Sequence, residues 1–486
     1  MKFLPGTIFK RFFNSTRLTY EIPDEYHNSF YLANASLLQI VNYFIHSSYK
    51  VIFPELIEKV VSYWNCSPGE AALRIRTCIA QLDRCDSVVD VYIPLRRFHK
   101  GMPNLTMVRA NRAYHATAFY DKSLGGLRFD PDLKRYNSQG FAAHQTYRNA
   151  LFGMATAGSA GGIKFCPYVL DASEMQDLLA EFISSFPKFH NLNDMIEPDL
   201  GSTSKEMDIL RSYHNLAPHI TILGKSEALG GIPDHKKASG RCTIQSIKRF
   251  LANEKIANRV GFSELQDRTY VIQGLGQAGK DIALMLHKEG ALCIGVREHD
   301  CMLYEPAGIH VKALFKHITK FGTMRGFNPK CREYDLDSLF TQPCDILILS
   351  ALERSISCKI ADKVQAKVLV EVANLPISPT AYRILVNSNK LVIPGILAGA
   401  GPSLMSYYEH SVRSGKNNID PQNVPDLFNT SLQSAIDDVI DIEEKLKLNF
   451  NFLEASYVRA IRHLFKRIIK HQLMAENTKQ KMIGMQ

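Results

Sequence analysis

The chain has 486 residues, of which 45% are apolar and 22% are charged, and its formal net charge is +10. This composition is typical of a globular, well-buried protein, and the length indicates two or three domains. No stretch approaches the roughly 18 apolar residues of a membrane-spanning helix, and no recognised nucleic-acid-binding signature accompanies the positive charge. We therefore expect neither a membrane span nor a nucleic-acid partner.

The ten cysteines form no Cys-x-x-Cys pair and no zinc-like Cys/His spacing. We therefore predict no metal site, and the scatter of the cysteines suits a reducing compartment with mostly buried thiols.

The first twenty residues contain four basic residues and no acid before Glu21. Six apolar residues among them could form one face of a short helix, so residues 1–20 are typical of a mitochondrial targeting segment. A disordered basic tail is the alternative. Residues 21–87 then show apolar residues at helical spacing and are predicted to be mainly helical.

Alternating apolar residues predict strands over 88–93 and 105–110. A helix capped by Ser138 is expected to run through Gln145 and Arg148 to residue 152, with these two side chains on one face. A glycine-rich loop, Ala-Gly-Ser-Ala-Gly-Gly-Ile at 157–163, is expected directly after it.

A nucleotide-binding pattern occupies residues 269–298. A short apolar strand at 269–273 leads into Gly-Leu-Gly-Gln-Ala-Gly at 274–279, followed by a helix and a second strand that ends beside Glu298. The glycines allow a tight turn and the close approach of a pyrophosphate to a helix N-terminus. The whole order of strand, glycine-rich turn, helix, strand and acid is typical of a dinucleotide site.

Further apolar strands at 345–349, 367–371 and 391–394 predict a mainly parallel, doubly wound sheet. A last amphipathic helix from residue 455 to about 473 could pack back on the first domain. We predict an α/β fold with an N-terminal substrate and oligomerisation domain and a Rossmann-like dinucleotide-binding domain. The expected divisions are 1–20 (targeting), 21–222 (substrate and oligomerisation), 223–448 (dinucleotide-binding) and 449–486 (C-terminal helix).

Several separate motifs, in order, resemble those of the glutamate dehydrogenase family. Leu-Gly-Gly-Leu-Arg-Phe at 124–129 is similar to the family's Lys-Gly-Gly-x-Arg-Phe, and Ile-Glu-Pro-Asp-Leu-Gly at 196–201 is similar to Pro-Ala-Pro-Asp-Met-Gly. Val-Ala-Asn at 372–374 resembles Gly-Ala-Asn, and the stretch at 400–409 resembles the family's closing substrate motif. The chain is thereby identified as a member of this family, from about residue 93 to residue 469.

The resemblance implies a role for each matching residue. Asp199 matches the aspartate that exchanges protons with the substrate nitrogen, and Gln145 matches a polar residue that lines the substrate pocket. Ser406 matches the serine that helps to hold the side-chain carboxylate of the substrate. The implied cofactor-binding residues are Ser239, Gly274, Gly276, Gly279, Glu298 and Asn374.

Three lysines of the family motifs are replaced. Leu124 stands where a lysine pairs with the side-chain carboxylate, and Arg148 replaces a lysine near the main-chain carboxylate. Ala160 stands where a lysine polarises water and the developing tetrahedral centre. Since removing an acid–base group costs about 100- to 10,000-fold in rate, the resemblance implies a catalytically impaired enzyme or a pseudoenzyme.

Three alternatives stay open. An active dehydrogenase could use a compensating cation, either Lys122 or Lys164, to oxidise glutamate. An apolar residue at position 124 also resembles the leucine and phenylalanine dehydrogenases, which would make an apolar amino acid the substrate. A structural or regulatory mitochondrial subunit is the third alternative.

The resemblance also implies partners and location. The cofactor is NAD or NADP, because Glu298 suits the ribose diol of NAD while the adjacent Arg297 could meet the extra phosphate of NADP. Glutamate with 2-oxoglutarate, or an apolar amino acid, would be the substrate. The expected assembly is a homo-hexamer or a mixed oligomer with a paralogue, in the mitochondrial matrix.

Overall fold

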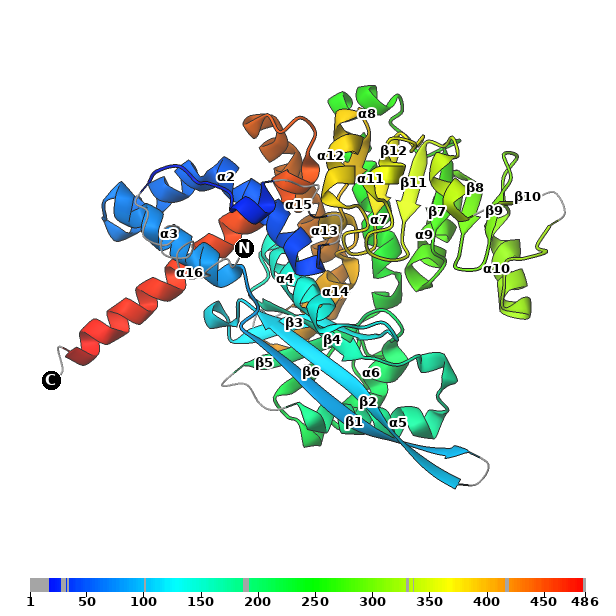
Figure 1. The fold of residues 1–486 in the computed structure, drawn as a ribbon, viewed down its shortest axis with the longest axis horizontal. Helices are drawn as coiled ribbons and strands as arrows, with labels where there is room; N and C mark the ends of the chain where they lie inside the picture. Colours follow the sequence, from blue (N-terminus) through cyan, green and yellow to red (C-terminus); the bar gives the residue numbers. More distant parts are fainter. Residues whose placement is uncertain are drawn as a thin grey trace, which may run out of the picture. The chain divides into compact units, whose positions relative to one another are not determined.

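The computed structural model describes residues 17–27, 32, 35–99, 102–186, 192–328, 332–334, 336–415 and 419–483. The chain divides into two compact units, whose elements are labelled in Figure 1. Unit 1 comprises Met1–Asn28, Ser36–Leu229 and Tyr457–Gln486, and unit 2 comprises Ser29–Ala35 and Gly230–Ser456.

Two helices lie early in the described part of unit 1, and they confirm the mainly helical character predicted for residues 21–87. Helix α2 spans Leu37–Trp64 and helix α3 spans Pro68–Leu82. Each begins with a capping box, in which the N-cap serine, Ser36 or Ser67, exchanges hydrogen bonds with the residue three positions on. These bonds satisfy backbone N–H groups that a helix start leaves without a partner.

The segment before α2 is bound to unit 1 by a buried tyrosine and a buried arginine. The Tyr20 side chain is 5% exposed, and its hydroxyl lies 2.5 Å from Nδ1 of His46 on α2. Arg76 on α3 donates hydrogen bonds to the backbone carbonyls of Arg17 and Thr19, at 2.7 and 2.8 Å. Residues 17–20 therefore pack within unit 1, while residues 1–16 of the predicted targeting segment lie outside the described residues.

Removal of residues 1–20 is expected to destabilise unit 1 relative to removal of residues 1–16. Truncation of a buried aromatic side chain costs about 3–5 kcal/mol, and the longer deletion removes both Tyr20 and the carbonyls that Arg76 binds. Thermal unfolding of the two truncated proteins measures the difference. Equal melting temperatures would contradict the anchoring role of residues 17–20.

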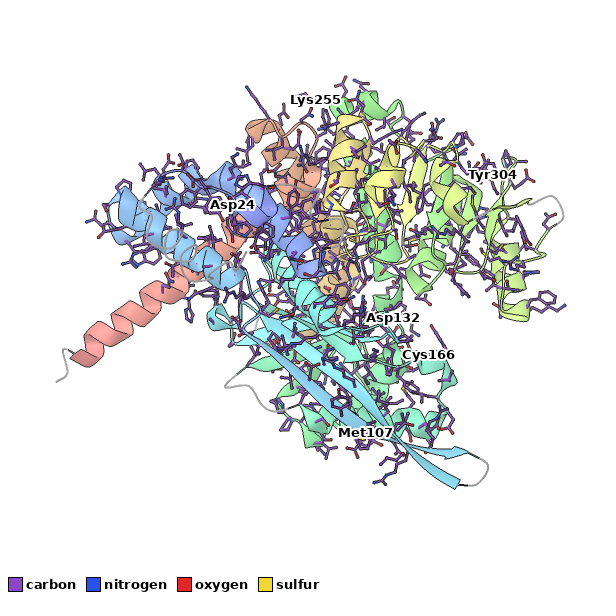
Figure 2. The ribbon with its side chains drawn as sticks, viewed as in Figure 1. Asp24, Met107, Asp132, Cys166, Lys255 and Tyr304 are labelled. Atoms are coloured by element: carbon purple, nitrogen blue, oxygen red, sulfur yellow. The ribbon has the colours of Figure 1, made fainter. Side chains whose placement is uncertain are left out.

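The main sheet of unit 1 has six strands in the order β1-β2-β4-β3-β5-β6. The β1–β2 and β2–β4 pairs are antiparallel, and the β4–β3, β3–β5 and β5–β6 pairs are parallel. The hairpin of β1 and β2 carries the exposed Met107 (Figure 2). The strands are β1 Ser87–His99, β2 Met102–His115, β3 Lys122–Phe129, β4 Ala157–Ile163, β5 Asn193–Pro198 and β6 Ile220–Ile222.

Helices cover both faces of this sheet. Helix α4, Arg135–Leu151, lies on one face. Helices α5, Ala172–Ser185, and α6, Ser204–Ser212, lie on the other face, where both form an apolar core with the strands. The prediction that Ser138 caps α4 is wrong, since the helix begins at Arg135. Ser138 is instead buried within α4 and donates a hydrogen bond to Oδ1 of Asn111, at 2.6 Å.

The glycine-rich stretch predicted as a loop is strand β4, and all seven of its residues are buried. Its glycines serve close packing rather than a turn. A Cβ atom at Gly158 would lie 2.1 Å from the carbonyl oxygen of Ala142 on α4, and one at Gly161 would lie 2.1 Å from that of Asn111 on β2. The absence of side chains therefore lets α4 and β2 approach the β4 backbone closely.

Unit 2 contains a seven-stranded sheet in the order β10-β9-β8-β7-β11-β12-β13. Strands β8, β7, β11, β12 and β13 run parallel, and β9 and β10 form an antiparallel edge. This doubly wound sheet confirms the predicted fold class. The strands are β7 Thr269–Gln273, β8 Leu292–Arg297, β9 Met302–Tyr304, β10 Arg332–Tyr334, β11 Ile346–Leu349, β12 Val368–Glu371 and β13 Leu391–Ile393.

The helices of unit 2 precede, connect and follow these strands along the chain. They are α7 Ala238–Leu251, α8 Glu254–Val260, α9 Gln277–Lys288, α10 Val311–Phe321, α11 Cys358–Ala361, α12 Pro379–Asn387, α13 Gly395–Ala398, α14 Gly401–Ser414 and α15 Val424–Leu446. The 3-10 turns that the structure describes in the two units include η1 Asp24–Tyr26, η3 Thr117–Phe119, η4 Pro167–Val169, η5 His214–Leu216, η6 Glu227–Leu229, η7 His235–Lys237, η8 Leu336–Thr341 and η9 Pro421–Asn423.

The last helix, α16, spans Phe452–Ile483, and from Tyr457 onward it belongs to unit 1. Arg462 forms an ion pair with Glu55 of α2 at 2.6 Å, and Arg467 donates a hydrogen bond to the carbonyl of Phe119 at 3.3 Å. Both arginines are thus engaged within unit 1. Within the described ranges, none of the helices combines the length and the apolar character that crossing a membrane requires.

Candidate active site and dinucleotide turn

The residues that the sequence singles out in unit 1 lie on the face of the sheet that α4 covers. On β2, Asn111 and His115 hydrogen-bond to α4, so the alternate residue Ala113 between them faces the same way. Ala160 is the direct antiparallel partner of Ala113, and paired residues share a face. The Ala160 methyl group therefore points toward α4, and it is 5% exposed.

Leu124 lies on the same face. It pairs with Gly158 across the β3–β4 ladder, and its side chain is fully buried. Two of the three positions at which the family motifs carry a lysine, 124 and 160, are therefore apolar and shielded from water. A ligand carboxylate beside these positions would lose its water, and neither position would supply an ammonium to pair with it. Burying an unpaired charge in this way costs binding free energy.

Asp199 follows β5 and receives a bidentate ion pair from Arg128 of β3. The Nε and Nη2 atoms of Arg128 lie 3.2 and 3.3 Å from the two carboxylate oxygens. The guanidinium is nearly buried and stacks on the ring of Phe141 from α4, with 3.9 Å between the guanidinium carbon and the ring centroid. The backbone N–H of Leu200 also donates to Asp199, at 2.7 Å. Asp199 is thus held in one orientation.

Gly126 explains why the motif needs a glycine beside this carboxylate. A Cβ atom at Gly126 would lie 2.5 Å from Cβ of Asp199 and 2.8 Å from its Oδ2. The motif at 124–129 therefore does two things: Gly126 leaves room for Asp199, and Arg128, two residues later, binds it. Sequence reasoning assigned no role to Arg128, although its place in the motif was the available signal.

Among the described residues, no lysine ammonium lies within 4.0 Å of the Asp199 carboxylate. Of the two lysines considered as compensating cations, Lys164 is exposed directly after β4, and Lys122 is half-buried at the start of β3. The cation beside Asp199 is a guanidinium, which neither accepts nor releases protons in proteins.

Gln145 and Arg148 lie on one face of α4, as the helical spacing predicts, and both are buried. Nη1 of Arg148 donates to Oε1 of Gln145 at 3.3 Å, and Nη2 lies 3.2 Å from Nε2 of His144. Nε2 of Gln145 in turn donates to Oδ1 of Asn149, at 2.8 Å. His144 is a further member of this cluster that sequence reasoning missed, since a single histidine on a buried helix gives no signal.

On the opposite face of the sheet, a buried ion pair ties four strands together. Arg112 of β2 binds both carboxylate oxygens of Asp194 on β5. Ser123 of β3 and Ser159 of β4 donate to the same carboxylate, at 3.0 and 3.1 Å. A buried ion pair with this many hydrogen bonds fixes the register of the strands that carry Leu124, Ala160 and Asp199.

In unit 2, the predicted glycine-rich turn lies at the carboxyl end of β7, where the strand order reverses between β7 and β11. Gly274 has φ +91°, and a Cβ atom there would lie 2.9 Å from the backbone of Ala351. A Cβ atom at Gly279 would lie 2.0 Å from the carbonyl oxygen of Gly274. The fold therefore requires both glycines.

Gly276 differs from these two glycines. It is the N-cap of α9, and a Cβ atom there would have no described neighbour within 4 Å. No side chain caps this helix start. One turn N–H, that of Leu275, donates to Oε1 of Glu298, which places the predicted acid beside the turn. A helix N-terminus with open space before it suits an anionic group.

The other predicted residues of unit 2 lie on separate elements. Ser239 is half-buried in the first turn of α7, and Asn374 is half-buried three residues after β12. Ser406 is fully buried on α14, and its hydroxyl lies 2.9 Å from Nε2 of His235. His235 precedes α7 and was not singled out from the sequence.

Glu371, the last residue of β12, is a buried carboxyl group of unit 2. It is 1% exposed, and Oε2 accepts a hydrogen bond from the N–H of Gly395 at 2.9 Å. Burial raises the pKa of Glu371 from 4.5 to about 7, although hydrogen bonds from backbone N–H groups act in the opposite direction.

The free energy of unfolding is expected to fall as pH rises from 4.5 to about 7, because in this window the native Glu371 binds more protons than the unfolded one. Above that window its contribution is constant. The loss amounts to on the order of 3 kcal/mol. Denaturant unfolding across the window measures it, and Glu371→Gln, which stays neutral, is expected to remove this component of the slope. An identical slope in the variant would contradict the assignment.

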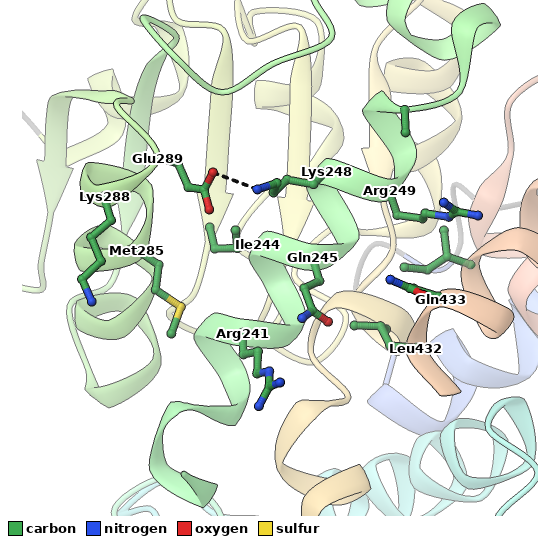
Figure 3. Close-up of a pocket in the computed structure, with 12 residues that line it drawn as sticks. Arg241, Ile244, Gln245, Lys248, Arg249, Met285, Lys288, Glu289, Leu432 and Gln433 are labelled. Carbon is green, nitrogen blue, oxygen red and sulfur yellow. Dashed lines mark hydrogen bonds and ion pairs between the residues drawn. The ribbon is translucent and has the colours of Figure 1, made fainter. Parts of the chain in front are cut away.

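A separate basic pocket of about 480 Å³ lies between α7, α9 and α15 (Figure 3). Two of its cations form ion pairs, Lys248 with Glu289 at 2.9 Å and Arg249 with Asp437 at 2.6 Å. Arg241 donates to the carbonyl of Pro425, at 3.4 Å. These contacts bind the helices of unit 2 to one another and partly neutralise the pocket.

Comparison with family models and curated proteins gives a consistent picture. The model described as Glutamate/Leucine/Phenylalanine/Valine dehydrogenase matches residues 230–472, and the one described as Glu/Leu/Phe/Val dehydrogenase, dimerisation domain, matches residues 86–215. The mitochondrial glutamate dehydrogenase of Dictyostelium discoideum is 26% identical over 367 residues, which cover 74% of this chain and 71% of that protein.

Two further relatives differ in their named cofactor. The NADP-specific glutamate dehydrogenase A1 of Halobacterium salinarum is 29% identical over 325 residues, 65% of this chain and 75% of its own. The NAD-specific glutamate dehydrogenase of Staphylococcus aureus is 26% identical over 380 residues, 77% of this chain and 88% of its own.

Solved structures share the fold. The hetero-hexameric glutamate dehydrogenase of Thermus thermophilus in its Leu bound form has a TM-score of 0.70 at 24% identity, with 85% of this chain and 94% of that chain covered. Another glutamate dehydrogenase structure has a TM-score of 0.74 at 18% identity, with 89% and 94% covered.

Proposed function

The chain belongs to the glutamate/leucine/phenylalanine/valine dehydrogenase family, and we propose that it is a member that binds a nicotinamide dinucleotide but oxidises amino acids very poorly. One observation carries the proposal. Asp199 is paired with the guanidinium of Arg128, and no described lysine ammonium reaches it, while position 160 offers only a methyl group.

In the family reaction, glutamate gives up a hydride, and water then attacks the oxidised carbon and supplies the keto oxygen of 2-oxoglutarate as ammonia leaves. A bound dinucleotide would supply the hydride acceptor. In this chain Asp199 would exchange a proton with the substrate nitrogen, and Arg148 would bind the main-chain carboxylate. Without an ammonium at position 160, nothing there polarises the attacking water, and losing such a charged stabiliser costs roughly 3–4 kcal/mol in the barrier.

The residues present fit a dinucleotide. Gly276 leaves open space before the uncapped N-terminus of α9, where backbone N–H groups can bind the pyrophosphate. Glu298 lies at the turn and suits the ribose. Ser239 and Asn374 would contact the nicotinamide end. The proposal covers NAD and NADP alike, in keeping with relatives of both kinds.

The test combines binding and turnover. Calorimetric titration of the purified protein with NAD and NADP is expected to show saturable binding of at least one dinucleotide. Assays with glutamate and with leucine, using both dinucleotides, are expected to show negligible turnover. If the protein bound neither NAD nor NADP, the cofactor assignment would be refuted. Turnover rates in the usual enzyme range of about 1 per second or more would refute the proposed impairment.

An apolar amino acid is the second candidate substrate, and the burial of Leu124 favours it. A leucine side chain there would tolerate an aliphatic substrate better than the desolvated carboxylate of glutamate. A rate with leucine well above that with glutamate in the same assay would support this alternative.

Assembly and location extend the proposal. The match to a dimerisation domain at residues 86–215 and the likeness to a hetero-hexameric relative support a hexamer, either of one chain or mixed with an active paralogue as a structural or regulatory subunit. The mitochondrial relative and the basic N-terminal segment support a place in the mitochondrial matrix. Light scattering of the purified protein and imaging of the tagged chain test these points.

A further inference from the structure

The guanidinium of Arg148 is held at both of its terminal nitrogens by buried hydrogen-bond chains. From Nη1, the chain runs through Gln145 and Asn149, whose Nδ2 donates to the carbonyl of Ala157 at the start of β4, at 3.0 Å. From Nη2, it runs through His144, whose Nδ1 lies 3.3 Å from the hydroxyl of Tyr457 on α16. All of these links lie within unit 1.

The chemistry of the groups fixes the direction of the second chain. A guanidinium only donates hydrogen bonds, so Nε2 of His144 must accept from Arg148. The ring proton then lies on Nδ1 and is donated to the oxygen of Tyr457. Burial and the charge of Arg148 hold the pKa of His144 well below its usual range, so the ring is neutral at physiological pH.

A guanidinium is planar, so the orientation of its plane decides where its N–H groups point, whereas the ammonium of the family's lysine has no plane to orient. The two acceptors on α4 that contact its terminal nitrogens, Gln145 and His144, are uncharged, so these two contacts orient the guanidinium without neutralising it. His144, Gln145 and Arg148 are each 6% exposed or less, and Asn149 and Tyr457 are fully buried. These buried side chains hold the Arg148 cation in a fixed orientation, away from water.

We infer that His144 and Tyr457 are positioning residues that set the guanidinium of Arg148 to bind the main-chain carboxylate of an amino acid or 2-oxo acid. The inference rests on the proposed function, which gives Arg148 this ligand. It adds that the C-terminal helix α16 helps to shape the carboxylate site through the hydrogen bond between Tyr457 and His144.

The test measures the binding of 2-oxoglutarate and of 4-methyl-2-oxopentanoate by calorimetry, in the presence of the bound dinucleotide. His144→Leu is expected to weaken binding of the 2-oxo acid about tenfold, since a hydrogen bond to a charged group contributes roughly that much. His144→Glu is expected to weaken it further, because its carboxylate competes with the ligand for Arg148. Tyr457→Phe is expected to cost about threefold, and His144→Gln, a neutral acceptor, is expected to retain most of the affinity.

Controls separate positioning from general destabilisation. His115→Gln removes another fully buried histidine that contacts α4 through Thr146, and it is expected to leave the 2-oxo acid affinity unchanged. In an Arg148→Met background, His144→Leu is expected to have no further effect on binding. Dinucleotide affinity, which belongs to unit 2, is expected to stay constant in all variants.

The outcomes distinguish this inference from the function on which it rests. Wild-type affinity in His144→Leu and His144→Glu, or an equal loss in the Arg148→Met background, would overturn the positioning role alone. Failure of the wild-type protein to bind either 2-oxo acid at millimolar concentration would overturn both the inference and the substrate assignment. The dinucleotide result would stand independently of either.

Discussion

Lysine at positions 160 and 124 together is expected to raise glutamate turnover about 100-fold or more above the wild-type rate, the size of effect that acid–base and charge stabilisation bring. Ala160→Lys restores an ammonium to the face that carries Asp199, and Leu124→Lys restores a counter-charge for the side-chain carboxylate. Ala160→Lys alone is expected to give a smaller gain, since Leu124 would still oppose glutamate. Steady-state kinetics of the wild type and of both variants measure the difference.

Methionine at the same two positions is the matched control, because it has nearly the length of lysine and no charge. Ala160 is 5% exposed and lies beside Ala113 on the face that α4 covers, so a longer side chain must extend beneath α4 and has a packing cost in either variant. A gain in the lysine variants that is absent in the methionine variants isolates the charge. Equal rates in wild type and in lysine variants that fold as stably as the wild type would reject the impaired-site hypothesis.

Gly276→Ala is expected to lower dinucleotide affinity at least tenfold while leaving the melting temperature almost unchanged. A Cβ atom at this position has no described neighbour within 4 Å, and φ is −59°, so the fold itself tolerates alanine. The same methyl group would occupy the space in which the proposed pyrophosphate approaches the N-terminus of α9. Titration calorimetry and thermal unfolding of the same preparation measure both quantities.

Gly279→Ala provides the contrast. Its Cβ atom would lie 2.0 Å from the carbonyl oxygen of Gly274, so this variant must shift backbone and is expected to lose stability and binding together. Unchanged dinucleotide affinity in Gly276→Ala would contradict the assignment of this turn as the pyrophosphate site.

The sequence predicts the dinucleotide-binding unit well because its signals are local. A strand, a glycine-rich turn, a helix and a second strand follow within thirty residues, and β7 spans the predicted residues 269–273. Strand β4 shows the limit of such reasoning. Glycines in a strand and in a turn look alike in sequence, and only the approach of α4 to Gly158 distinguishes the two.

The candidate site is predicted only in part, since much of it depends on contacts between residues far apart in the chain. His144 and Tyr457 are 313 positions apart, and no spacing rule joins them. Arg128 and Asp199 each stand in a recognised motif, yet their pairing appears only when β3 and β5 lie side by side. Which residues are replaced can be read from the sequence, whereas which neighbours they meet requires the fold.

The methyl group at position 160 also bears on how such a chain could evolve. Alanine and lysine codons differ by more than one nucleotide, so a return to lysine passes through an intermediate such as threonine or glutamate. Glutamate would add a second buried carboxylate to the face that already holds Asp199, and selection would remove it. The path through threonine stays open, so any return to lysine at position 160 is expected to pass through that residue.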